Sequence, residues 1–263
     1  MELSLSTGWV YLAFLIPAFL TTVGLLIVAI KRVRSGRMPN YIFWPILFVI
    51  VSLLLALAGI IVDAALAMQH LPSIFEALHL PREQMDQLFK SNLGYFVFSI
   101  ILHAVIRPLW WYLCIVATCA WIKLCLRLPH KNFYNKTTID YILAAVSVLL
   151  PIIVLITNKS NWMTLTLSTR IICVMGTGIL ALVGLTQATK VTDETIKRLL
   201  NLIGLWSLAS FGFYAFELLY IHAHNNALLP YTINYVPACL DIAAQLALIG
   251  YLLFGVFGTT KNN

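Results

Sequence analysis

Apolar residues fill seven stretches of this chain, and short polar segments separate them. The stretches run over roughly 9–30, 41–68, 95–122, 138–157, 164–187, 199–221 and 232–257. A helix needs about 20 apolar residues to cross the hydrocarbon core of a bilayer, so each stretch is long enough to span one. The pattern predicts an all-α, multi-pass integral membrane protein. We expect residues 1–263 to form a single domain, a bundle of seven transmembrane helices.

Composition and charge agree with a membrane protein and predict how the chain is oriented in the membrane. Hydrophobic residues make up 61% of the chain and charged residues 10%, with a mean hydropathy of +0.90, whereas soluble domains carry about 25% charged residues. Of the 17 basic residues, twelve fall in 31–37, 123–136, 190–198 and at Lys261, and three in the other connections. Cytoplasmic loops collect Lys and Arg, so the N-terminus is predicted outside and the C-terminus in the cytoplasm. The net charge of +7 then favours contact with membrane lipid, and we expect no nucleic-acid partner.

The longest connection, 69–94, is predicted on the outside. His70–Leu78 has the pattern of a short helix that begins near Pro72, and Pro81–Phe89 has the pattern of a second. We interpret the connection as lying at the membrane interface. The alternative is a lid over the mouth of the bundle.

Ionisable residues inside the predicted spans are the strongest sign of a working site, because each costs about 2.5–3.5 kcal/mol to insert. Counted along each helix from its outer end, all of them fall in the outer half or near the midplane. They are Asp63 in the second span, His103 and Arg107 in the third, Arg170 in the fifth, Glu217 in the sixth and Asp241 in the seventh. We predict a polar pocket that opens to the outside; the alternative is an ion-pair network that only fixes helix order.

Spacing indicates which of these side chains share a helix face. His103 and Arg107 are four residues apart, as are Asp241 and Gln245, so each pair lies on one face. Arg107 paired with Asp241, or with Asp63, would compensate the charges. Tryptophans complete the predicted ligand-binding set as walls for a flat apolar ligand, although core packing explains them equally well. These are Trp110, Trp111 and Trp206. No grouping of His or Cys with carboxylates predicts a metal site.

Three local stretches, with the size and layout of the chain, resemble the microbial rhodopsins. Arg107-Pro108-Leu109-Trp110-Trp111 is similar to the third-span stretch of that family, and Leu205-Trp206-Ser207 to its retinal-contacting tryptophan region. Leu240-Asp241-Ile242-Ala243-Ala244-Gln245 is similar to its seventh-span Asp-x-x-x-Lys, which implies a counter-ion role for Asp241. The family's retinal-binding lysine is Gln245 here, and no other lysine lies in the core of a span. We therefore expect no covalent retinal and no cofactor.

The leading hypothesis is a receptor-like or sensor-like seven-helix protein with an outer-half pocket for a small apolar or amphipathic ligand. One alternative is a membrane-bound cyclase or isomerase acting on a lipid or isoprenoid. There Asp241, kept protonated by its apolar surroundings, would donate the proton, with Asp63 as its partner; Leu240-Asp241-Ile242 looks like the seventh-span acid of small seven-helix terpene cyclases. A third hypothesis is a small-solute transporter with helices broken at Pro108 and Pro237.

Overall fold

The structure, a computed structural model, describes residues 2–78, 113, 115–129, 162–223 and 231–258, with eight single residues between 142 and 156. Its long helices are α1 (Glu2–Arg34), α2 (Asn40–Leu78), α6 (Trp162–Ala188), α7 (Glu194–Ala223) and α8 (Tyr231–Gly250). The last of these continues as a π-helix, η1 (Tyr251–Val256), and residues 115–127 form a further helical segment. All regular structure in the described ranges is helical, as the sequence predicts.

Five of these helices contain a segment that is long and apolar enough to cross a membrane. The segments are Leu12–Arg34, Asn40–Gly59, Ile171–Ala188, Glu194–Leu219 and Cys239–Val256. They correspond to the first, second, fifth, sixth and seventh predicted spans. The helical segment 115–127 covers the end of the third predicted span and continues past residue 122, where we had placed its end. The eight single residues described between 142 and 156 are also helical and fall in the fourth.

The outer surface of the bundle is apolar, as a lipid environment requires. Leu20 on α1, Leu182 on α6 and Leu219 on α7 expose 64%, 69% and 68% of their surface. A second set of apolar side chains, with Leu15, Ile50 and Ile203 fully buried, forms a core shared by the helices. A helix that is apolar on both its inner and its outer face is typical of a membrane span. These features agree with the prediction of an integral membrane protein.

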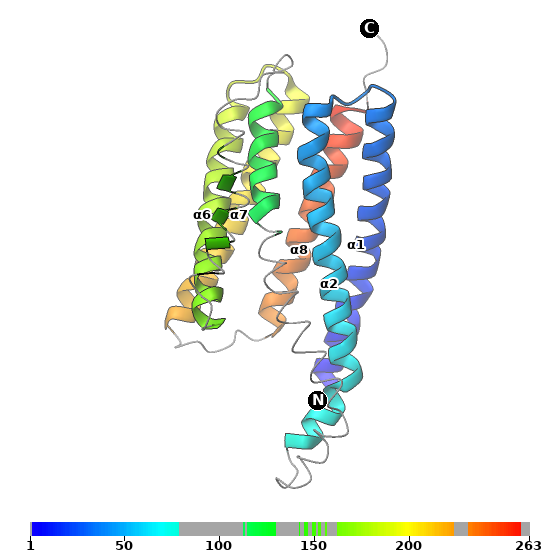
Figure 1. Cartoon of the computed structure of the whole chain (residues 1–263), viewed down its shortest axis with the longest axis vertical. Coiled ribbons are helices and arrows are strands. Elements are labelled where there is room, and N and C mark those ends of the chain that lie inside the picture. The colour runs from blue at the N-terminus through cyan, green and yellow to red at the C-terminus, as the bar shows by residue number, and fades with distance from the viewer. Residues whose placement is uncertain are drawn as a thin grey trace.

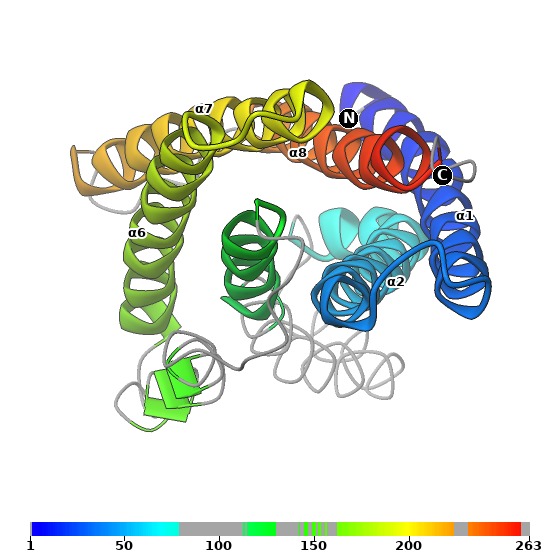
Figure 2. The same cartoon turned by 90° about the horizontal axis from the view of Figure 1, so that it is seen from above.

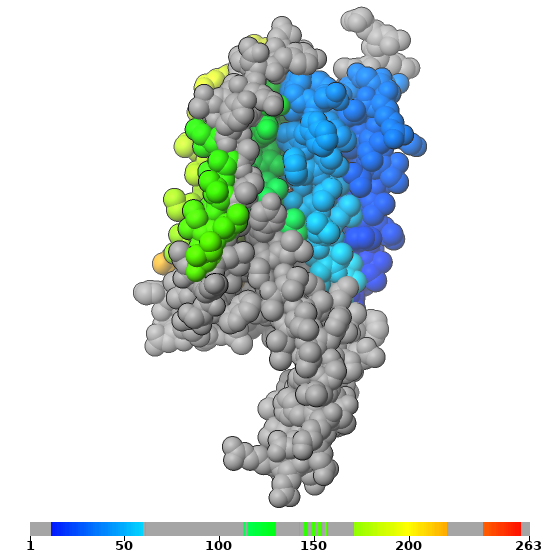
Figure 3. Space-filling model, viewed as in Figure 1, coloured from blue at the N-terminus to red at the C-terminus, as the bar shows by residue number. Residues whose placement is uncertain are grey.

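The helices run side by side along the long axis of the molecule (Figure 1). Seen from above, α6, α7, α8 and α1 follow one another around the bundle, and α2 lies beside α1 (Figure 2). In the space-filling view, α1 and α2 together make up one side of the molecule (Figure 3). The segment 115–127 lies inside this arc, between α2 and α6 (Figure 2). Its position brings it into contact with the helices that carry the candidate site.

Glycines allow α6 and α7 to approach closely. A Cβ atom at Gly204 of α7 would lie 2.7 Å from Leu185 Cγ on α6, and one at Gly184 would lie 3.1 Å from the Gly204 Cα. On α6, Gly176 lies against Thr118 of the segment 115–127, where an added Cβ would come within 3.1 Å of Thr118 Cγ2. Small residues at such crossings are the usual way to pack helices tightly within a membrane.

The second helix is longer than the sequence pattern predicts. The sequence pattern predicts a separate short helix that begins near Pro72, and this is wrong, because α2 continues without a break to Leu78. Proline fixes a φ that suits a helix and removes a single main-chain donor, so the surrounding helix-favouring residues carry the helix past it. The second predicted short helix, 81–89, and therefore any lid, lie outside the described residues.

Candidate functional site

The centre of the candidate site is Asp241 on α8. Its neighbours in sequence show which way it points: Leu240 exposes 65% of its surface on the lipid side, whereas Ile242 is buried at 7%. Asp241 itself is partly buried. It lies ten residues after Tyr231, the first residue of α8, which is about 15 Å along the helix. Asp241 therefore lies two residues inside the segment Cys239–Val256, which is long and apolar enough to cross a membrane.

Three side chains donate hydrogen bonds to this carboxylate. Trp206 Nε1 and Ser210 Oγ, both on α7, donate to Asp241 Oδ1 at 2.8 and 3.0 Å. Gln245 Nε2, one turn further along α8, donates to Oδ2 at 2.9 Å. All three donors are neutral, and none of the described Lys, Arg or His side chains forms an ion pair with Asp241. Hydrogen bonds from two helices fix the orientation of the carboxylate.

Helix periodicity explains why these four residues meet. Trp206 and Ser210 are four residues apart on α7, and Asp241 and Gln245 are four residues apart on α8, so each pair lies on one helix face. The two faces meet because α7 and α8 are neighbours in the bundle (Figure 2). Trp206, Asp241 and Gln245 were singled out from sequence, and the structure brings all three together.

Two further residues extend the site, and neither of them stands out in the sequence. Ser210 is 9% exposed and supplies one of the two α7 donors. Trp121, on the segment 115–127, is 1% exposed and packs against Trp206 with ring centroids 5.7 Å apart and planes inclined at 59°. Its Nε1 is the one buried side-chain nitrogen without an acceptor in the described part of the chain. The only signal for Ser210 was its position one turn after Trp206.

Glu217 lies further along the same face of α7. It is 7% exposed and follows Ser210 by seven residues, which is two helical turns or about 10 Å. Both residues belong to the inward face of the helix, since the nearby Phe216 and Leu219 expose 56% and 68% of their surface. A second carboxylate thus lies between the Asp241 cluster and the far end of α7.

The remaining predicted site residues cannot be compared with this cluster. Asp63 and Arg170 lie on α2 and α6, but their side chains are not among those that the structure describes. Four residues of the third span lie outside the described residues altogether. They are His103, Arg107, Trp110 and Trp111. The pairing of Arg107 with Asp241 therefore stays a prediction.

The donors in the described part of the chain leave one acceptor position of the carboxylate open. Among these residues, Asp241 Oδ1 accepts two hydrogen bonds, from Trp206 and Ser210, and Oδ2 accepts one, from Gln245. Each carboxylate oxygen has two lone pairs. Oδ2 can therefore accept a donor from a bound molecule, or carry a proton when the group is neutral. The indole ring of Trp206, which packs on the buried Trp121, supplies an apolar aromatic surface beside it.

Comparison of the chain with protein-family models, with curated proteins and with solved structures finds no match. Its function therefore has to be argued from the cluster itself.

Proposed function

We propose that this chain is a receptor-like or sensor-like membrane protein that binds a small apolar or amphipathic ligand at Asp241. The observation that carries the proposal is the carboxylate of Asp241, which lies within the span Cys239–Val256 and receives three neutral hydrogen bonds. Ionisable groups at such depth are rare and usually functional. Trp206 and Gln245 hold it in a fixed orientation, with Oδ2 open to one further donor.

The surroundings of Asp241 suit a ligand that is mostly apolar and carries one polar group. Small-molecule sites are walled mainly by aromatic and apolar side chains, with a few fixed polar groups that set orientation. Here Trp206 contributes both features, because its ring packs on Trp121 and its N–H donates to the carboxylate. The contact between Trp206 and Asp241 also joins two of the stretches that resemble microbial rhodopsins, and this supports a ligand between α7 and α8.

The proposed bundle has seven spans, with the N-terminus outside and the C-terminus in the cytoplasm. Five long apolar helices support it, together with helical residues inside the third and fourth predicted spans. Two hydrogen bonds support the proposed orientation in the membrane, because they bring basic segments that are far apart in the sequence to the same end of the bundle. Arg32 Nη1 on α1 donates to the Phe257 carbonyl at 2.9 Å, and Arg127 Nη1 donates to the Tyr41 carbonyl at 3.0 Å. Both arginines belong to the basic segments that we assign to the cytoplasm. A reporter fused after Asn263 should be cytoplasmic, and labelling of residues 79–94 only after permeabilisation would contradict this direction.

A membrane-bound cyclase or isomerase is the second candidate, and the open position on Asp241 Oδ2 favours it. A proton on that oxygen would point at the same space as a bound ligand and could be donated to an epoxide or alkene. Asp63 would then be the second acid. An epoxidised farnesol incubated with the protein should give a cyclised isomer only if this candidate is right. The transporter hypothesis gains no such support, since α8 runs through Pro237 without a break.

The experiment that tests ligand binding compares small molecules that co-purify with the full-length protein. Wild type and variants are purified in mild detergent and extracted, and the extracts are compared by mass spectrometry. We expect a small molecule other than phospholipid in stoichiometric amount with wild type, less with Ser210→Ala and none with Asp241→Leu. Ser207→Ala is the matched control, because Ser207 is also buried on α7 but donates to the Ile203 carbonyl of its own helix at 2.7 Å.

Folding of each variant is checked by gel filtration and thermal melting, so that a lost ligand is not confused with a lost fold. The same extract composition from wild type, Ser207→Ala, Ser210→Ala and a folded Asp241→Leu protein would contradict the proposal.

A further inference from the structure

One end of the bundle carries a large excess of positive charge. In the described ranges, nine basic side chains lie at or near this end and only two acidic ones, Asp193 and Glu194. The basic residues are Lys31, Arg32, Arg34, Arg37, Lys123, Arg127, Lys190, Lys197 and Arg198. Both carboxylates already have partners. Asp193 Oδ1 accepts hydrogen bonds from the main-chain N–H groups of Thr195 and Ile196 at 2.9 and 3.3 Å, and Glu194 Oε1 forms an ion pair with Lys197 Nζ at 3.5 Å. Nine basic side chains against two acidic ones therefore give this end a net positive charge among the described residues.

The turn between α1 and α2 holds part of this charge in a fixed position. Gly36 adopts a left-handed φ of +70°, and its N–H bonds to the Val33 carbonyl while the Arg37 N–H bonds to the Arg32 carbonyl, both at 3.0 Å. This pattern is the Schellman motif, which ends a helix in a rigid turn. Met38, 2% exposed, anchors the turn in the core. Arg34 and Arg37 are exposed on either side of the glycine.

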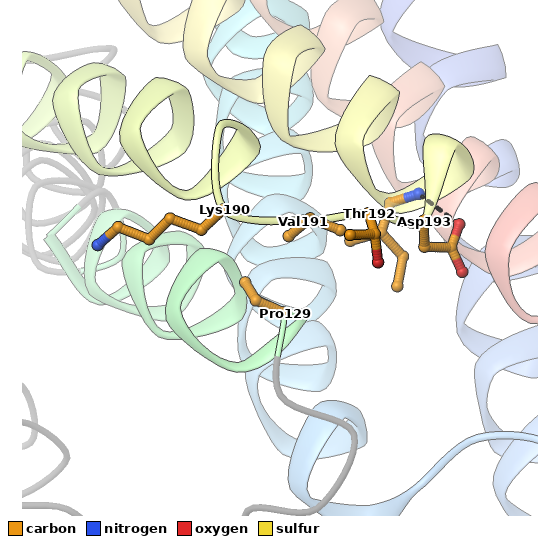
Figure 4. A pocket seen from close by; sticks show the side chains of 6 residues that line it. Pro129, Lys190, Val191, Thr192 and Asp193 are labelled. Atoms are coloured by element: carbon orange, nitrogen blue, oxygen red, sulfur yellow. Dashed lines mark hydrogen bonds between the residues drawn. The ribbon is translucent and has the colours of Figure 1, made fainter.

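A groove lies at the same end, between the end of the segment 115–127 and the turn that joins α6 to α7. Its volume is about 320 Å³, and it is lined by Pro129, Lys190, Val191, Thr192, Asp193 and Ile196. Figure 4 shows that the Lys190 side chain extends to one end of the groove and the Asp193 carboxylate to the other. The lining of the groove is thus mainly polar, with Pro129, Val191 and Ile196 as its apolar residues and the Lys190 side chain at the opposite end from the Asp193 carboxylate.

We propose that this groove binds the headgroup of an anionic phospholipid, with the lipid phosphate at Lys190 and the ester region against Pro129 and Val191. Lys190 follows the end of α6, Ala188, by two residues, so its amine lies at the boundary of a membrane span. Basic side chains at that level attract anionic lipids. The exposed Arg34 and Arg37 strengthen the attraction over the rest of this end. The proposal does not depend on the ligand site at Asp241.

The groove and the charge together favour a lipid over an acidic protein or a nucleic acid. The groove is lined by the turn that follows α6 and by Ile196 near the start of α7, and both helices contain a segment that is long and apolar enough to cross a membrane. At that level a bilayer presents the headgroups of its own lipids. A lipid can therefore enter sideways from the bilayer without leaving it.

The test measures lipid binding to the full-length protein by native mass spectrometry, with palmitoyl-oleoyl phosphatidylglycerol and the matching phosphatidylcholine as probes. We expect wild type to bind phosphatidylglycerol more tightly than phosphatidylcholine. Lys190→Gln should weaken phosphatidylglycerol binding by about fivefold, the effect of one basic residue near a membrane surface, and leave phosphatidylcholine binding unchanged. Arg34→Gln/Arg37→Gln should also weaken it.

Two control variants separate the groove from a general effect of charge. Lys90→Gln removes one positive charge from the connection that we predict on the opposite side, and Glu194→Gln/Lys197→Gln removes an ion pair beside the groove without changing the net charge. Both should bind phosphatidylglycerol like wild type. Equal binding of the two lipids by wild type, or phosphatidylglycerol binding that Lys190→Gln does not weaken, would overturn the proposal. The proposal would also be overturned if Lys190→Gln weakened the binding of polyglutamate but not the binding of lipid, because that result would indicate an acidic protein partner.

Discussion

Replacing Asp241 with asparagine removes the charge of the carboxylate while its hydrogen-bond partners stay within reach. The asparagine Oδ1 can still accept from Trp206 Nε1 and Ser210 Oγ, which lie 2.8 and 3.0 Å from the carboxylate oxygen. The new Nδ2 would face Gln245 Nε2, now 2.9 Å from Oδ2, and a half turn of the Gln245 amide presents its oxygen instead. Hydrogen bonds across membrane helices contribute about 0.6 kcal/mol on average. The loss from hydrogen bonding alone should therefore stay below about 1 kcal/mol.

Any larger loss has to come from a charge that Asp241 compensates, and we predict that this charge is Arg107. Removing one member of a buried pair leaves the other uncompensated, at a cost of about 3–5 kcal/mol. Asp241→Asn and Arg107→Leu should each show a loss of this size. The double variant should recover at least about 2 kcal/mol relative to the sum of the single losses, because no charge is then unpaired.

The assay is unfolding of the detergent-solubilised protein by dodecyl sulfate, followed by circular dichroism, with the free energy of unfolding as the result. Ligand retention by the double variant gives a second result: we expect stability to return while retention stays lost. Additive losses, with Asp241→Asn alone costing less than about 1 kcal/mol, would refute the pairing. Asp63→Asn in the Arg107→Leu background then tests the other predicted partner.

The remaining predictions concern packing and the missing lysine. Ser210→Ala should lower the free energy of unfolding by about 0.5–1.5 kcal/mol more than Ser207→Ala, because only Ser210 bonds to the neighbouring helix; equal losses would contradict this. Gly204→Ala should lower the free energy of unfolding by about 1–3 kcal/mol, and with it the melting temperature, because the added methyl group overpacks against α6. Gly212→Ala, on the same helix but with open space around it, should leave the stability unchanged or raise it. All-trans retinal should give no borohydride-reducible adduct, since Gln245 replaces the lysine, and a trapped adduct would show that another lysine reaches the pocket.

The membrane-spanning character of the chain could be predicted from sequence, because a run of about 20 apolar residues is sufficient evidence for a span. The shared face of Asp241 and Gln245 could also be predicted, since it follows from the four-residue spacing within one helix. Both inferences need only local geometry. The length of α2 could not be predicted this way, because Pro72 is compatible with either the end or the continuation of a helix.

The partners of Asp241 depend on how neighbouring helices are rotated, and that information is not local. Ser207 and Ser210 look alike in sequence, yet one bonds to its own helix and the other to Asp241. Serine in an apolar helix commonly bonds to the carbonyl four residues earlier. The sequence therefore does not show that Ser210, unlike Ser207, bonds to a neighbouring helix. The choice of Trp121 over other tryptophans likewise follows from the position of the segment 115–127 inside the bundle (Figure 2).

A small molecule that binds at the open carboxylate oxygen of Asp241 should be visible in a crystal structure of the full-length protein grown from a lipidic mesophase. We expect non-protein density between α7 and α8, with a polar atom within hydrogen-bonding distance of Asp241 Oδ2 and an apolar body against the ring of Trp206. A structure in which only protein groups contact the Asp241 carboxylate, with side chains filling the space beside Trp206, would contradict it.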